Sequence, residues 1–153
     1  MIPLLMDAAS TNPTYPPTII FTGATAGIKA SAKFAAFASA KFGLRALSQS
    51  LAKEFGPKGV HVCHVVADGV FDSDRGREFT GGQSEGLMDT EEMAESYWKL
   101  HTQGKRAWTW EIDLRPYLVF AFDGSVLIDL GEMVNIKVIC IDKYNCDLSS
   151  SQM

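Results

Sequence analysis

The chain of 153 residues has the length of one domain, which is enough to bury a hydrophobic core. Its hydrophobic content of 46% and charged content of 21% are ordinary for a globular protein. The formal net charge of −4 gives no basic surface for nucleic acid or for an anionic membrane, so neither partner is expected. No apolar stretch reaches the roughly 20 residues that a membrane span needs.

The cysteines indicate a reducing compartment. Cys63, Cys140 and Cys146 form neither a CxxC pair nor a paired framework, and such a sparse, odd count is typical of free thiols. The N-terminal sequence MIPLLMDAAS lacks the basic flank of a signal peptide. We therefore expect a cytoplasmic protein.

The first third of the chain predicts a leader, a strand and a long helix. Residues 1–17 contain four prolines among small polar residues and are expected to be irregular. A β-branched run at 18–22 predicts a buried strand that ends at Gly23. From Ser31 to Phe55 there is no proline, and apolar residues recur at three- and four-residue spacing. This spacing predicts an amphipathic helix with Ser31 as its cap, in which Phe37, Leu44, Leu47 and Leu51 are buried.

The rest of the chain continues the alternation of strands and helices. The elements predicted next are a strand at 60–66, a mobile polar loop at 72–87, a helix at 90–103 and a strand at 108–114. This order predicts an α/β fold with a parallel sheet and right-handed crossovers. The tail at 117–153 is atypical, and its two β-prone runs around Gly131 predict a β-hairpin.

The glycine-rich segment at 22–28, TGATAGI, allows two interpretations. As a phosphate loop, its glycines would let backbone N–H groups and a helix N-terminus approach a pyrophosphate. Against this, Lys29 stands where the third glycine of the fingerprint is expected. No acidic residue follows about 20 residues later to hold a ribose.

The second interpretation uses more of the chain. Residues 17–116 resemble the C-terminal half of the short-chain dehydrogenase/reductase family, and FASAK at 37–41 is a close variant of that family's usual YSASK. The resemblance implies a partial Rossmann-like domain at 18–116 that lacks the N-terminal nucleotide-binding βαβ unit. It also implies descent from an oxidoreductase that uses NAD or NADP.

The same resemblance assigns the candidate site residues. The family's catalytic lysine corresponds to Lys41, its tyrosine position is occupied by Phe37, and its serine position is occupied by Ala24. Thr25 is the adjacent hydroxyl that would substitute for the carbonyl-orienting serine. The residues implied to contact the cofactor are Lys41, Asp68, Gly69 and Val70.

These substitutions determine the expected chemistry. Phe37 has no proton to transfer and Ala24 has no hydroxyl, and losing a positioned acid or base commonly costs about 10²–10⁴-fold in rate. We expect a truncated, catalytically impaired member that does not bind NAD(P) by itself and whose sheet has an unpaired edge. The alternative is a non-catalytic pseudoenzyme or interaction module that forms a homodimer through the 31–55 helix, as family members do.

His61, Cys63 and His64 invite comparison with a metal site. In a strand, His61 and Cys63 share one face while His64 points to the other, so the three side chains cannot converge. No metal site is assigned, and the histidines are expected to be core residues.

Overall fold

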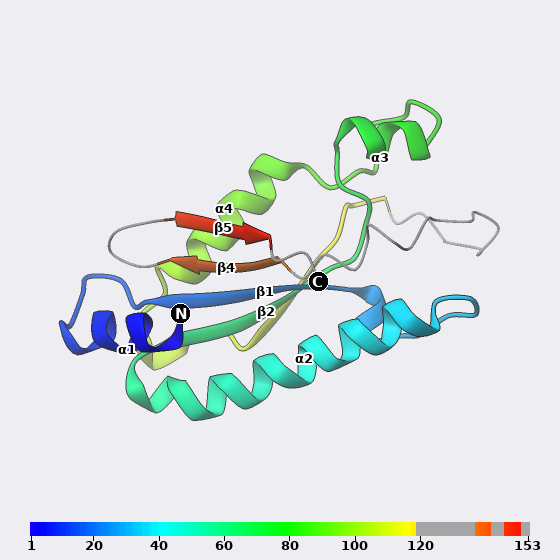
Figure 1. The fold of residues 1–153 in the computed structure, drawn as a ribbon. Coiled ribbons are helices and arrows are strands. Elements are labelled where there is room, and N and C mark those ends of the chain that lie inside the picture. The colour runs from blue at the N-terminus through cyan, green and yellow to red at the C-terminus, as the bar shows by residue number, and fades with distance from the viewer. Residues whose placement is uncertain (119–136, 142–145, 151–153) are drawn as a thin grey trace.

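The computed structural model describes residues 1–118, 137–141 and 146–150 of the chain. Five strands form one sheet in the order β3-β2-β1-β4-β5 (Figure 1). Three of them are mutually parallel: β1 (Thr18–Ala24), β2 (His61–Ala67) and β3 (Glu111–Leu114). The prediction of an α/β fold built on neighbouring parallel strands is therefore confirmed.

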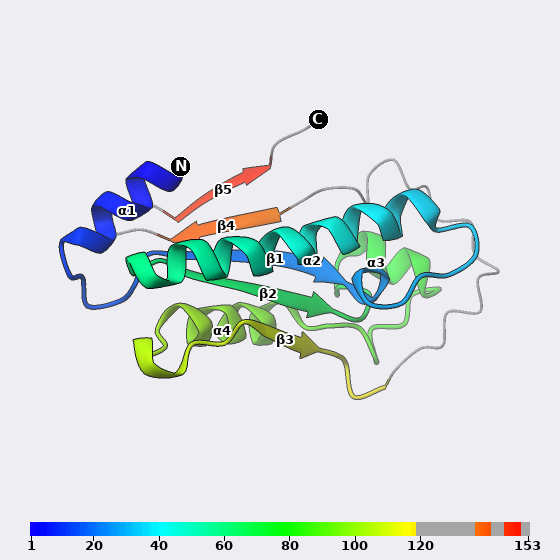
Figure 2. The ribbon, with the colours of Figure 1, turned by 90° about the horizontal axis from the view of Figure 1, so that it is seen from below.

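Helices cover both faces of the parallel strands. The long helix α2 (Ala35–Phe55) lies across one face and α4 (Thr90–His101) across the other (Figure 2). Short 3-10 turns at Thr25–Gly27, Gly56–Lys58 and Lys105–Ala107 complete the connections. Because both faces are covered, every residue of β2 is buried, as is usual for parallel strands between helices.

The core has one layer on each side of the sheet. On the α2 side, Phe21 and Val62 pack against Leu44 and Phe55. On the α4 side, Ile20, Cys63 and Val65 pack with Tyr97 and Leu100. None of the helices within the described residues is long and apolar enough to cross a membrane.

The prediction of an irregular leader is wrong for its first part, because α1 (Ile2–Ser10) is a helix. Pro3 is compatible with it, since the first helical turn does not need that backbone N–H group. Leu5 is buried in the α2-side core, with Ile2, Met6 and Ala9 packed around it. These four residues have the three- and four-residue spacing of one helix face. Their packing against the core stabilises the helix, although prolines follow it in the chain.

Helix α2 begins later than expected and buries a narrower face. Its N-cap is Phe34 and not Ser31, because Lys33 has a left-handed backbone with φ of 69° that interrupts the helix before it starts. Leu44 is 4% exposed, but Leu47 is 48% exposed, so the predicted burial of Leu47 is wrong. Leu51 is partly buried.

The loop predicted at 72–87 contains a short helix, α3 (Asp74–Phe79). Ser73 caps it by accepting a hydrogen bond from the backbone N–H of Gly76 at 3.1 Å, which is the usual role of serine at this position. Strand β3 begins at Glu111, three residues later than the predicted start at 108. The helix expected at 90–103 is present and begins from the Asp89 cap, whose side chain accepts from the N–H groups of Glu91 and Glu92.

The tail pairs with the sheet. Strand β4 (Lys137–Ile141) runs antiparallel to β1, and β5 (Cys146–Ser150) runs antiparallel to β4. The paired strands of the tail therefore lie beyond Gly131, which is itself outside the described residues. The expectation of an unpaired sheet edge at β1 is wrong, because β4 supplies partners for its N–H and C=O groups (Figure 1).

Candidate functional site

The candidate site lies where β1 and β2 end. Ala24 and Ala67 are partners at the last position of the parallel register, so Thr25 and Asp68 follow side by side. Thr25 Oγ1 donates a hydrogen bond to Asp68 Oδ1. The guanidinium of Arg115, just beyond β3, lies 3.0 Å from the other carboxylate oxygen of Asp68. These contacts join three parallel strands at their carboxyl ends, where ligands bind in open α/β sheets.

The hydrogen bond determines what Thr25 offers to a ligand. A hydroxyl has one proton and two lone pairs, and a carboxylate only accepts. Because Thr25 donates its one hydroxyl proton to Asp68, it presents only lone pairs to its surroundings and has no second proton for a carbonyl oxygen. As folded, it does not replace a serine that donates to a carbonyl.

Lys41 and Phe37 lie one turn apart on α2 and are both buried. Lys41 is 6% exposed, and its Nζ donates to the backbone oxygen of Thr22 at 3.2 Å. The same nitrogen is 5.6 Å from the centre of the Phe37 ring. Burial lowers the pKa of Lys41, because the charged form loses solvation. The lysine is thus an interior group and not a solvated helix residue.

A network of charged side chains lies between α2 and the sheet. Both nitrogens of the Arg45 fork, Nε and Nη2, are 2.7 Å from the carboxylate oxygens of Glu111. Nδ1 of His64 is 2.9 Å from Glu111 Oε2. The hydrogen bond from Arg45 lowers the pKa of Glu111, and burial lowers the pKa of His64. At neutral pH the network therefore consists of a guanidinium, a carboxylate and a neutral imidazole.

The two glycines of the segment at 22–28 have packing roles. A Cβ on Gly23 would lie 2.2 Å from Nε2 of His64, so the imidazole occupies the space that a side chain would need. A Cβ on Gly27 would lie 3.1 Å from the backbone oxygen of Lys41, which shows how closely α2 approaches the turn. Both glycines are explained by contacts within the chain, without a phosphate group.

The turn at 68–70, which was expected to contact a cofactor, is in contact with other residues of the chain. A Cβ on Gly69 would lie 2.8 Å from Met88 Cγ and 2.9 Å from Pro116 Cδ. The backbone oxygen of Val70 accepts a hydrogen bond from the N–H of Met88 at 2.8 Å. Asp68 is occupied by Thr25 and Arg115. The segment 68–70 is thus in contact with Thr25 and with residues from later in the chain.

The remaining titratable residues of β2 lie apart from this site. The His61 ring stacks on Trp108 at 4.8 Å with an interplanar angle of 7°, and Nε2 of His61 is 3.0 Å from the backbone oxygen of Thr109. Burial raises the pKa of Cys63 to about 12, so its thiol stays protonated. No group of three His, Cys, Asp or Glu side chains within the described residues could hold a metal ion.

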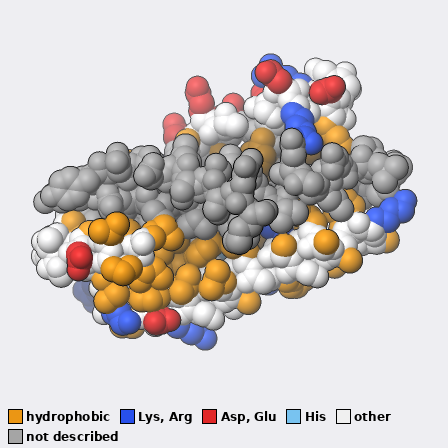
Figure 3. Space-filling model, viewed as in Figure 1, with side chains coloured by type: hydrophobic (Ala, Val, Ile, Leu, Met, Phe, Trp, Pro, Cys, Tyr) orange, Lys and Arg blue, Asp and Glu red, His pale blue; other side chains and the backbone are white. Residues whose placement is uncertain are grey.

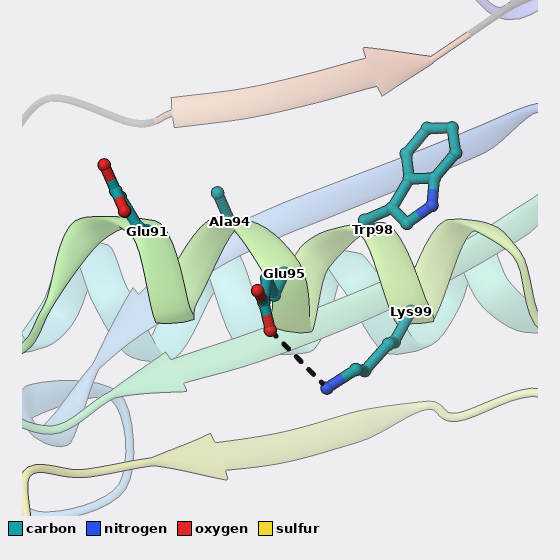
Figure 4. Close-up of a pocket in the computed structure, with 5 residues that line it drawn as sticks. All are labelled: Glu91, Ala94, Glu95, Trp98 and Lys99. Atoms are coloured by element: carbon teal, nitrogen blue, oxygen red, sulfur yellow. Dashed lines mark ion pairs between the residues drawn. The ribbon is translucent and has the colours of Figure 1, made fainter.

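A shallow hollow lies on α4, away from these residues. It has a volume of about 560 Å³ and is lined by one helix face, with Glu91, Ala94, Glu95, Trp98 and Lys99 (Figure 4). Glu95 and Lys99, one turn apart on this helix, form a loose ion pair at 3.9 Å. None of the residues expected at the active site lines it.

The sequence interpretation missed several members of the site. Arg45, Glu111 and Arg115 were not singled out, although Arg45 follows Lys41 by four residues and so shares its helix face. Asp68 was assigned to a cofactor and not to Thr25. The available signal is its position: Thr25 and Asp68 lie two or three residues beyond the predicted strands at 18–22 and 60–66, and directly after the observed strands β1 and β2.

Comparison with known proteins gives related chains. Residues 15–83 match the family described as short chain dehydrogenase. A short-chain dehydrogenase from Rhodopseudomonas palustris is 43% identical; the match covers 65% of this chain and 38% of that one, with a TM-score of 0.49. No curated protein matches the chain.

Two further solved structures share the fold. An NADPH-bound short chain oxidoreductase from Pseudomonas aeruginosa PAO1, described as containing an atypical catalytic center, is 20% identical over 66% of this chain and 45% of that one, with a TM-score of 0.56. A short chain dehydrogenase from Salmonella enterica serovar Typhi is 22% identical over 73% and 44%, with a TM-score of 0.58. The chain spans less than half the length of each of these proteins.

Proposed function

We propose that the chain belongs to the short-chain dehydrogenase family, which its residues 15–83 match, and that it is an oxidoreductase-like protein impaired in carbonyl chemistry. One observation carries the proposal. At the two positions where the family has a hydroxyl donor, the chain has Phe37 and Ala24, and the hydroxyl of the adjacent Thr25 already donates its proton to Asp68 in a hydrogen bond. Without a donor, the charge that develops on a carbonyl oxygen during reduction is not stabilised.

The residues expected to hold the cofactor do not fit it as they are folded. NAD or NADP would supply the hydride in this family. The amine of Lys41 is buried, donates to the Thr22 backbone oxygen and lies 5.6 Å from the centre of the Phe37 ring. The turn at Gly69 is closed by Met88 and Pro116. This arrangement supports the proposal that the chain alone binds neither nucleotide tightly.

The first experiment is a titration of the chain with NADH and NADPH, followed by nucleotide fluorescence and by calorimetry. We expect no saturable binding in the low micromolar range. A dissociation constant in that range for either nucleotide would contradict the proposed loss of the cofactor site.

The second experiment adds the missing phenol. Phe37→Tyr places a hydroxyl one turn from Lys41, but leaves Ala24 and the Thr25–Asp68 pair unchanged. We expect no NADPH-dependent turnover of a panel of carbonyl compounds by this variant. Phe34→Tyr is the matched control, because it adds the same group one turn earlier, next to the Phe37 ring. Turnover by Phe37→Tyr but not by Phe34→Tyr would refute the proposal.

A second candidate function is a helix-mediated interaction module, which we propose as a homodimer through α2. Phe42 and Leu47 are 42% and 48% exposed on the helix, and nothing lies within 4 Å of a Cβ built on Gly43 between them. Hydrophobic side chains also gather over α1 and the adjoining part of α2 (Figure 3). Apolar surface of this kind favours association.

The test of the dimer is light scattering coupled to gel filtration. We expect the wild-type chain to elute with twice its monomer mass, and Phe42→Lys with Leu47→Lys to elute as a monomer. Ile28→Lys is the control, because Ile28 is similarly exposed but lies outside α2. A monomeric wild-type chain would remove this candidate.

We also propose a cytoplasmic location. The buried, protonated thiol of Cys63 and the sparse cysteine count are compatible with a reducing compartment.

A further inference from the structure

The amine of Lys41 lies inside the protein against uncharged groups. The whole residue is 6% exposed, and its Nζ donates to the backbone oxygen of Thr22 at 3.2 Å. A second neighbour is the Phe37 ring, whose centre is 5.6 Å from Nζ. Among the residues that the structure describes, no carboxylate forms an ion pair with Lys41. A charge on this amine would therefore have no opposite charge beside it.

The charged groups between α2 and the sheet are paired with each other. Arg45 follows Lys41 by one helical turn, and both arms of its guanidinium are 2.7 Å from the carboxylate of Glu111. The same carboxylate accepts from Nδ1 of His64 at 2.9 Å. Burial lowers the pKa of His64, so its ring is neutral at pH 7. Glu111 is thus committed to Arg45 and His64 and not to Lys41.

These surroundings favour the neutral form of the amine. Burial removes solvent from the ammonium ion and lowers the pKa of Lys41. A backbone carbonyl and an aromatic ring return only part of that solvation. The neutral amine keeps a lone pair in addition to the N–H that it donates to Thr22. A lysine in this state is a nucleophile toward a carbonyl carbon.

The amine also lies next to a partly open surface. Strand β1 is fully buried over Thr18–Phe21, but Thr22, Ala24 and Thr25 at its carboxyl end are each half-buried. Because the amine is bonded to the Thr22 backbone, it lies beside the part of β1 that a small molecule can approach.

We propose that Lys41 is a nucleophile that captures small aldehydes as an imine. The Nζ lone pair attacks the carbonyl carbon, and the carbonyl oxygen takes up a proton from water. The nitrogen gives its protons to water, the oxygen leaves as a water molecule, and a C=N bond replaces the C=O bond. Nothing is oxidised or reduced. The step needs neither a nucleotide nor a hydroxyl at Ala24 or Phe37, so it goes beyond the proposed function.

The test is reductive trapping on the wild-type chain. Propanal and sodium cyanoborohydride are added at pH 7, and samples taken over time are digested and analysed by mass spectrometry. The hydride of cyanoborohydride converts each imine to a stable propylamine. We expect Lys41 to be labelled at least about 10-fold faster than Lys53 and Lys58, because the rate follows the fraction of neutral amine.

Lys53 and Lys58 are matched controls. Each of their amines lies over an aromatic ring, at 5.9 Å and 4.7 Å from the ring centre, as the amine of Lys41 does. Both lysines are exposed, so they differ from Lys41 in burial. In urea that unfolds the chain, all three should be labelled at equal rates. Lys41→Arg should lose the fast label and leave the labelling of Lys53 and Lys58 unchanged.

Each outcome decides the proposal. Fast labelling of Lys41 that disappears on unfolding supports it. Labelling of Lys41 that is absent, or no faster than that of Lys53 and Lys58, overturns it, and so does fast labelling that persists in urea. The reaction contains no nucleotide, so its failure leaves the proposed function untouched. Tight nucleotide binding would contradict the proposed function without changing the result of the trapping.

Discussion

The replacement Gly23→Ala tests the packing at the centre of the site. The new Cβ would lie 2.2 Å from Nε2 and 2.5 Å from Cε1 of His64, well inside ordinary van der Waals contact. The imidazole cannot withdraw easily, because its Nδ1 is bonded to Glu111 and the residue is completely enclosed. Either the strand and ring move apart or the hydrogen bond to Glu111 breaks.

The expected cost is large for a single methyl group. Overpacking a well-packed interior costs about 1–3 kcal/mol. Breaking a hydrogen bond to a charged partner adds about 1.5–3 kcal/mol where the ring is displaced. We therefore expect Gly23→Ala to lower the free energy of unfolding by about 1–3 kcal/mol if the ring keeps its hydrogen bond, and by about 2.5–6 kcal/mol if the ring is displaced. Either loss is a substantial share of the total stability of a small domain.

The measurement is equilibrium unfolding in urea, with Gly43→Ala as the matched control. Gly43 lies within α2 with nothing inside 4 Å of its Cβ position, so alanine there should raise the free energy of unfolding by about 0.5–1 kcal/mol. The double variant Gly23→Ala with His64→Ala should recover part of the loss, because the colliding ring is gone. A Gly23→Ala variant within about 0.5 kcal/mol of wild type would refute this account of the glycine.

Three further outcomes follow from the structure. Burial lowers the pKa of His61, His64 and His101 below the unfolded value of 6.5, so the unfolded chain binds more protons than the folded one below that pH. In urea unfolding, this contribution to the free energy of unfolding should be complete above about pH 6.5 and should fall toward pH 5, by at most about 1.4 kcal/mol per pH unit per histidine. A free energy of unfolding that does not change over this pH range would contradict the prediction. Asp89→Ala should cost about 1 kcal/mol in the same assay, because Asp89 accepts from two N–H groups at the start of α4, whereas Asp89→Asn should cost less. Leu44→Ala should lower the free energy of unfolding by about 2–5 kcal/mol, because Leu44 is buried, and Leu47→Ala should lower it by less than about 0.5 kcal/mol, because Leu47 is exposed. Equal losses would show that the exposed face of α2 is covered in solution.

Local sequence determined the elements of this protein where burial and periodicity agree. The runs at 18–22 and 60–66 are apolar on both faces, and only a strand between two covering layers accommodates them. The absence of proline and the apolar spacing from residue 35 to residue 55 specify α2 in the same way. Spacing within FASAK also fixed Lys41 and Phe37 one turn apart, since that relation is a property of the helix alone.

Tertiary structure decided where those elements meet and which groups are satisfied there. The helix α1 forms because Leu5 is buried in the core. This contact could not be predicted from the local sequence, in which the nearby prolines indicate an irregular segment. Strand β4 reaches β1 from more than a hundred residues away, and its antiparallel pairing is a non-local choice. The Thr25 hydroxyl donates its hydrogen bond to Asp68 because parallel register brings two strand ends together. Gly23 is required where the ring of His64 from the neighbouring strand leaves no space for a Cβ atom. This contact also depends on the register of the two strands, which is set by the whole sheet.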